Sequence, residues 1–187
     1  KDSQLHMLQV INYNGKLVFN AFGYPVTVQE SPTSTTITDQ GTPARYVRIA
    51  LPGDNKILSI SEVEVFSGGV NIAINKKTSQ SSILNNDNKF AGDKAVDGRT
   101  DNPNSTSLFH SQPSSNPWWE VDLGSNQPID RIVVWRRTDS NQYPQQIDNF
   151  DLTLLDSNGR AVVRQFIGNR APVTKAEFST ATSGILR

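Results

Sequence analysis

Apolar and polar residues alternate in short runs along this chain, and no long stretch has the periodicity of an amphipathic helix. The alternating runs cover residues 45–51, 62–66 and 119–123, and residues 131–137 form a fourth strand that is apolar enough on both faces to be central. The 12 Gly and 10 Pro residues fall mostly between such runs, where they suit turns. A single helical turn is expected near residues 89–95. The pattern predicts an all-β fold built as an antiparallel sandwich.

Composition excludes several classes of protein. Lys and Arg total 18 and Asp and Glu total 18, so the net charge of zero disfavours nucleic-acid binding. The chain has no Cys, which rules out disulfides, zinc–thiolate sites and cysteine nucleophiles. No apolar run is long enough to span a bilayer. An ordered, non-membrane β domain is the remaining class.

Part of the chain is repeated. Residues 8–19 resemble residues 152–163, and each segment places two apolar strands around an Asn-Gly pair, a strong hairpin signal. Downstream, Pro-Val-Thr at 25–27 matches Pro-Val-Thr at 172–174. Two unrelated hairpins with common turn residues would also give the first match. The second match favours a duplication.

The repeat suggests how the chain is organised. Residues 1–68 resemble the back half of one unit, and residues 69–187 resemble the front of another unit without its last strands. A sandwich lacking those strands would expose a long edge. We therefore expect residues 45–66 to supply the closing strands of a circularly permuted domain over 45–187. Residues 1–44 would form a partial repeat with an extra β-hairpin.

A series of short motifs resembles the discoidin (coagulation factor 5/8 type C) family and, within it, the fucose-binding F-type lectins. The motifs lie at residues 70–73, 78–82, 94–98, 116–124 and 137–139. Residues 58–66 resemble the closing strand of the family, although here they come first. The resemblance implies an antiparallel jelly-roll β-sandwich with a galactose-binding-like fold.

One spacing resembles the F-type lectin motif in particular. His110 is followed by 26 residues and then by Arg137-Thr138-Asp139. The family motif continues with an Arg or Lys, but position 144 is Pro144, and one inserted residue leads to Gln145 or Gln146. One of the two cationic donors expected from the family is therefore missing.

The resemblance implies a sugar-binding site. Arg137 would donate to adjacent sugar oxygens, Asp139 would hold the guanidinium, His110 would contact a further hydroxyl, and Gln146 would replace the second cation. The side chains considered as an apolar cover for the methyl group of fucose are Phe109, Leu108 and Tyr143. Two other interpretations stay open, namely a solvated His110 and an ordinary surface pair of Arg137 with Asp139.

The resemblance also implies a structural calcium ion, held by oxygen atoms. The implied ligands are the carbonyl groups of Lys94, Arg99 and Ser61, the carboxylates of Asp97 and Glu62, and the carbonyl or hydroxyl of Ser107. Oxygen ligands with two formal charges suit Ca²⁺. If the site exists, Glu62 must lie beside Asp97. The alternative is that Asp97-Gly98 forms a plain turn.

The first functional hypothesis is a calcium-stabilised lectin module for fucose-containing or related glycans, secreted or on a cell surface, acting in adhesion and multivalent through oligomers or tandem repeats. The second is a discoidin module that binds protein or lipid through exposed apolar loops at residues 83–84 and 108–109. No phosphate-binding loop, catalytic triad pattern or acid–base pair is present, so the sequence does not predict an enzyme.

Overall fold

The computed structural model divides the chain into two compact units, Lys1–Thr38 and Asp39–Arg187. It describes residues 9–13, 16–20, 41–101, 104, 106–139, 144–168 and 175–180. In the first unit, β1 (Gln9–Tyr13) and β2 (Lys16–Asn20) pair in antiparallel register, with Tyr13 opposite Lys16. These two strands lie in the segment, residues 8–19, where the sequence predicts a hairpin; the partial repeat over residues 1–44 stays a prediction. The predicted boundary between residues 44 and 45 stays a prediction; the division between the two compact units falls between Thr38 and Asp39, and β3 begins at Thr42.

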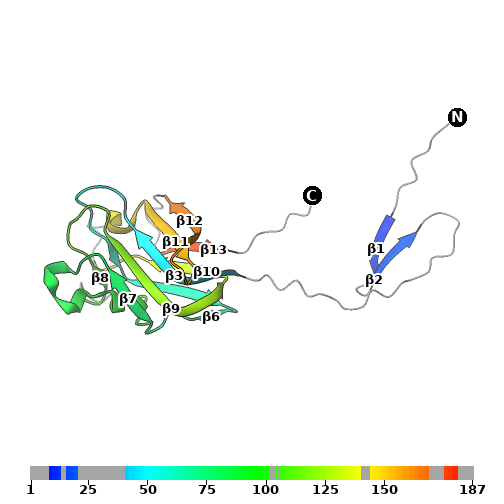
Figure 1. Cartoon of the computed structure of the whole chain (residues 1–187), viewed down its shortest axis with the longest axis horizontal. Helices are drawn as coiled ribbons and strands as arrows, with labels where there is room; N and C mark the ends of the chain where they lie inside the picture. Colours follow the sequence, from blue (N-terminus) through cyan, green and yellow to red (C-terminus); the bar gives the residue numbers. More distant parts are fainter. Residues whose placement is uncertain are drawn as a thin grey trace, which may run out of the picture. The chain divides into compact units, whose positions relative to one another are not determined.

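The second unit contains a five-stranded antiparallel sheet in the order β12-β11-β3-β9-β7. Its strands are β3 (Thr42–Ala50), β7 (Lys77–Gln80), β9 (Trp118–Ile129), β11 (Phe150–Leu155) and β12 (Ala161–Ile167). In Figure 1, the cyan β3 lies between β9 and β11, although both of these follow it by many residues.

A four-stranded antiparallel sheet, in the order β13-β10-β5-β6, forms the second layer. It is built from β5 (Glu62–Ser67), β6 (Val70–Asn71), β10 (Arg131–Trp135) and β13 (Lys175–Ser179). A two-stranded sheet joins β4 (Ser59–Ile60) to β8 (Phe109–His110). Every strand pair among the described residues is antiparallel, which confirms the predicted all-β class.

The core lies between these layers and explains the alternation in the sequence. Val47 and Ile49 of β3, Trp119 of β9, and Val63 and Val65 of β5 are fully buried in one apolar cluster. The segments that precede Val70 therefore complete the sandwich. β3 pairs with β9 and β11, and β5 pairs with β10; that these segments are the closing strands of a circularly permuted domain stays a prediction.

Helical structure among the described residues is confined to 3-10 turns. They are η1 (Leu84–Asn86), η2 (Asn88–Phe90), η3 (Gly92–Val96) and η4 (Pro144–Ile147). The single turn expected near residues 89–95 is thus two turns, η2 and η3, separated by Ala91. Within the part of the chain that the structure describes, no helix is long and apolar enough to cross a membrane.

The second predicted hairpin, β11–β12, forms with a wider turn than an Asn-Gly pair would give. β11 ends at Leu155 and β12 begins at Ala161, and the Asp156 N–H donates to the Arg160 carbonyl at 2.9 Å. The Asp156 carboxylate accepts the backbone N–H groups of Asn158 (2.8 Å) and Arg160 (2.9 Å). These bonds stabilise a five-residue turn in which Gly159 has a φ of 76°.

Candidate functional site

Three segments that are distant in sequence bring polar side chains to one place. The β4–β8 pairing sets Ser59 opposite His110. The Ser59 hydroxyl donates to the Gln146 amide oxygen (2.7 Å), and the same oxygen accepts an N–H of Arg137 (2.8 Å). The strand that carries His110 is therefore connected to the Arg137 guanidinium through the backbone pairing with Ser59 and the Ser59 and Gln146 side chains.

Arg137 is held by a two-pronged ion pair. Its Nε donates to Asp139 Oδ1 (2.9 Å) and its terminal nitrogen Nη2 to Asp139 Oδ2 (2.8 Å). The two side chains are only 6% and 8% exposed. The hydrogen bonds from Arg137 lower the pKa of Asp139, although partial burial opposes that shift. Asp139 thus fixes the plane of the guanidinium and offsets its charge.

His110 is buried, and its surroundings favour the neutral ring. Its Nδ1 lies 2.8 Å from the Ser111 carbonyl, which can only accept, so Nδ1 carries the proton and Nε2 is an acceptor. Burial lowers the pKa of His110, and the positive charge of Arg137 lowers it further. At neutral pH the cluster therefore combines one ring acceptor with a fixed cationic donor.

Sequence reasoning missed Ser59, which is fully buried. The sequence does not indicate that a serine on a short strand belongs to a binding site. Its position becomes clear only from the pairing of β4 with β8 and from its hydrogen bond to Gln146 in η4. The sequence also predicted Gln146 only as a replacement for the second cationic donor. The Gln146 side chain is buried and its oxygen is used twice, so it positions Arg137 as well as offering an amide N–H₂ group.

The predicted apolar cover is wrong for two of its three side chains. Phe109 and Leu108 are fully buried in the sandwich and cannot present a surface to a ligand. Their burial also removes one of the two apolar loop tips proposed for a protein- or lipid-binding module. Tyr143 lies outside the described residues. Phe90 is the aromatic side chain beside His110, with ring centroids 6.0 Å apart.

A second polar cluster surrounds Glu62, at the beginning of β5. The Glu62 side chain is fully buried, and its Oε1 accepts the backbone N–H of Gly98 at 3.0 Å. Its Oε2 is buried without a hydrogen-bond partner in the described structure. Burial raises the pKa of Glu62 to about 8, and the nearby Asp97 carboxylate adds to the rise. Glu62 thus lies beside Asp97-Gly98, as a shared ion site requires.

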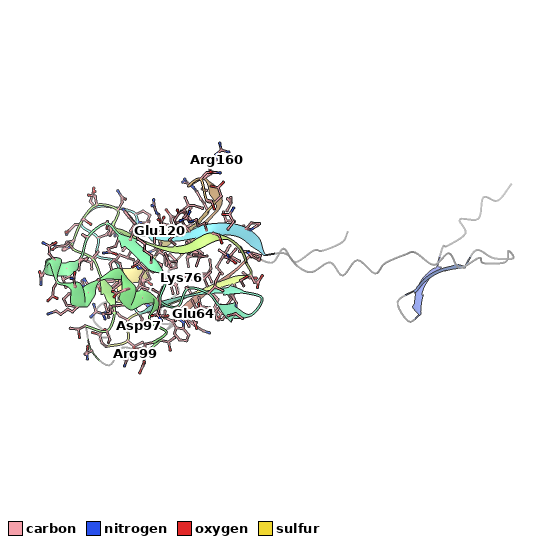
Figure 2. The ribbon with its side chains drawn as sticks, turned by 60° about the horizontal axis from the view of Figure 1, so that its bottom comes forward. Glu64, Lys76, Asp97, Arg99, Glu120 and Arg160 are labelled. Carbon is pink, nitrogen blue, oxygen red and sulfur yellow. The ribbon has the colours of Figure 1, made fainter. Side chains whose placement is uncertain are left out.

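The remaining predicted calcium ligands are placed as follows. Lys94 lies in η3, and Asp97 and Arg99 lie just beyond it on the side of the sandwich shown at the bottom of Figure 2. The Ser61 hydroxyl donates to the Thr100 carbonyl (3.3 Å), and the Ser107 hydroxyl donates to the Asn104 carbonyl (2.7 Å). Among the described residues no group of three His, Cys, Asp or Glu side chains could hold a metal. A site here would need backbone oxygens.

The fold agrees with the comparisons to known proteins. The family model of the NedA-like, galactose-binding domain of factor 5/8 type C matches residues 94–184. No curated protein sequence matches the chain. A solved fucose-binding module of Streptococcus pneumoniae shares 33% identity over 61% of this chain and 78% of its own, with a TM-score of 0.53.

Two further solved structures are similar. The lectin domain of lectinolysin, complexed with Lewis B antigen, is 31% identical, with a TM-score of 0.55 over 63% of this chain and 81% of its own. A histidine mutant of that domain, complexed with Lewis b, is 30% identical, with a TM-score of 0.55 over 62% of this chain and 80% of its own. The chain belongs to the factor 5/8 type C (discoidin) family of galactose-binding-like sandwiches. These relatives are binding modules rather than enzymes, as the sequence predicts for this chain.

Proposed function

We propose that this chain is a lectin module that binds fucose-containing glycans at the cluster of His110, Arg137, Asp139 and Gln146. The observation that carries the proposal is the connection from β8, the strand of His110, to the Arg137 guanidinium through Ser59 and Gln146. The similarity to a fucose-binding module and to a lectin domain complexed with a Lewis antigen supports it.

The chemistry of the cluster suits a neutral sugar. A sugar hydroxyl both donates and accepts, so it needs fixed partners of both kinds rather than a general base. In the proposed complex, Arg137 donates to oxygens on adjacent carbons, and His110 Nε2 accepts from a further hydroxyl. Asp139 and Gln146 keep the guanidinium in place during binding.

The missing second cation limits the affinity for a single sugar. A hydrogen bond to a charged group contributes about 1.5–3 kcal/mol, so replacing an Arg or Lys by the neutral Gln146 weakens binding about tenfold or more. Presentation in several copies would restore the overall strength through effective concentration. We therefore propose a multivalent adhesion role, secreted or on a cell surface.

We also propose a structural calcium ion at the Glu62 cluster. The unpartnered, buried Oε2 of Glu62 supports it, because a buried carboxylate without a partner is costly and a cation would offset that cost. The carboxylates of Glu62 and Asp97, with the oxygens of Lys94, Arg99, Ser61 and Ser107, would provide hard oxygen ligands. When bound, the ion would stabilise the loops around η3.

A glycan array tests the lectin proposal directly. The wild type, the His110→Ala variant and a Lys76→Ala control are applied to fucosylated and unfucosylated glycans, each with and without calcium. Lys76 is exposed and lies outside both clusters, so its variant controls for a lost surface side chain. We expect fucosylated glycans to bind the wild type and the control, and the His110→Ala signal to fall at least tenfold. An equal signal from His110→Ala would reject the proposed site.

A further inference from the structure

The second unit carries a groove on the outer face of the five-stranded sheet, separate from the His110 cluster. Tyr46 and Arg48 alternate with the buried Val47 and Ile49, so their side chains lie on the side of the sheet away from the core. The groove has a volume of about 430 Å³, within the range of ligand pockets. Its lining residues are Tyr46, Arg48, Glu120, Leu155 and Ser157 to Gly159.

The floor of the groove holds a fixed donor and a fixed acceptor. The Arg48 guanidinium lies over the Trp118 ring, 4.6 Å from its centroid, and its Nε donates to Glu120 Oε2 at 2.8 Å. The Arg48 side chain is 40% exposed and that of Glu120 15%. Within the described structure the terminal nitrogens of Arg48 make no hydrogen bond, so they can donate to a ligand, and Glu120 Oε1 can accept.

One wall of the groove is the β11–β12 turn, which is held at several points. The Asp156 carboxylate fixes the backbone of Asn158 and Arg160, and the Ser157 hydroxyl donates to Asn126 Oδ1 of β9 at 3.0 Å. Figure 2 shows Arg160 on this turn, projecting beyond the sheet, with Glu120 on the strand below it. A wall held in this way needs little ordering when a ligand binds.

The chemistry of the groove favours an uncharged ligand with hydroxyl groups. The charges of Arg48 and Glu120 cancel, so an anion would gain little from Arg48 while approaching the Glu120 carboxylate. Donor and acceptor lie side by side, as vicinal hydroxyls require, and Tyr46 and Leu155 add an aromatic ring and an aliphatic side chain. A saccharide presents this combination of hydroxyl pairs and apolar C–H faces.

We propose that this groove is a second carbohydrate-binding site, which takes an uncharged oligosaccharide. It goes beyond the function proposed above, because none of its lining residues belongs to the His110 cluster. In the view of Figure 2, Glu120 and Arg160 lie above Asp97 and Arg99, two residues of the proposed ion site. One chain would then hold two parts of a glycan surface and gain avidity.

NMR titration of the isotope-labelled 187-residue chain tests this site. The probe is lacto-N-neotetraose, an uncharged tetrasaccharide without fucose, added to about 10 mM so that millimolar dissociation constants are detected. We expect shifts of backbone signals in β3, β9 and the 156–160 turn. They should persist in His110→Ala, and the affinity should fall at least fivefold in Glu120→Gln and in Arg48→Gln.

Glu120→Gln keeps the size of the side chain, so it remains informative if Arg48→Gln, which loses the contact with Trp118, is unstable. The absence of shifts in the groove, shifts confined to the His110 cluster, or equal affinity in a folded Glu120→Gln variant would each overturn the proposal. A parallel titration with L-fucose reads the His110 site separately. A failure of fucose to bind would reject the lectin site and leave the groove result standing.

Discussion

Replacing Ser59 by Ala tests whether the connection between β8, the strand of His110, and the Arg137 guanidinium contributes to sugar binding. The Ser59 hydroxyl is fully buried and makes one 2.7 Å hydrogen bond to Gln146. Its removal leaves the Gln146 oxygen with the bond from Arg137, so no buried group loses its last partner. One neutral hydrogen bond contributes about 0.5–1.5 kcal/mol, and we expect that loss in the free energy of unfolding.

The same bond limits the motion of Gln146 and, through it, of Arg137. If the full contribution acts on the bound geometry, the affinity for L-fucose falls about twofold to tenfold in Ser59→Ala. Isothermal titration calorimetry measures the affinity, and urea denaturation measures the stability. Wild-type affinity in a variant that has lost the expected stability would refute the positioning role.

Ser111→Ala is the matched control. Its hydroxyl is equally buried, but it accepts the backbone N–H of Leu58 (2.9 Å), so its loss leaves a buried donor unpaired. We expect this variant to lose about 1–3 kcal/mol of stability, more than Ser59→Ala, with a smaller loss of fucose affinity. The opposite order of the two affinities would show that Ser59 has no specific part in the site.

Three further predictions concern the ion site, the histidine and the packing of η3. Calcium at about 100 times its dissociation constant should stabilise the wild type by about 2.7 kcal/mol, measured as a higher melting temperature that chelation reverses. The Glu62→Gln variant should lose most of this stabilisation. An unchanged stabilisation in that variant would exclude Glu62 as a ligand. Because the pKa of His110 is lowered, fucose affinity should stay constant down to about pH 6.5. It should fall only at lower pH, where protonation turns Nε2 into a donor. A loss of affinity that is already complete at about pH 7 would contradict a neutral, buried ring. Gly92→Ala should destabilise the fold by about 1–3 kcal/mol in urea denaturation. A Cβ at this position would lie 2.5 Å from Gln80 Oε1 and 3.0 Å from Trp119 Nε1. Wild-type stability in this variant would show that these side chains move aside at little cost.

Much of the sandwich follows from local sequence. Alternation predicts β3, β5 and β9, because each buries one face in the core between the two sheets, and the continuous apolar run of β10 predicts a central strand buried on both faces. Turn residues locate both hairpins. The width of the β11–β12 turn is also set by local contacts, but the Asn-Gly pair does not reveal it, because the Asp156 carboxylate accepts the backbone N–H groups of Asn158 and Arg160.

The candidate site could also be predicted from the sequence only in part. The spacing of His110 and Arg137-Thr138-Asp139 indicates which residues to consider, and the structure brings them together. The spacing does not show that Phe109, next to His110, points into the core. Both residues of β8 are buried, so only the packing around this strand shows that Phe109 belongs to the apolar core.

The sequence by itself therefore determines the strand pattern, the family motifs and the kinds of side chain available for binding. Only the tertiary structure decides that Ser59 and Gln146 connect the strand of His110 to Arg137, that Glu62 reaches the loop at Gly98, and that a groove opens over Arg48 and Glu120. The physical reason is that each of these contacts depends on the register between strands far apart in the chain. A shift of one residue in such a register would turn each side chain to the other face of its sheet.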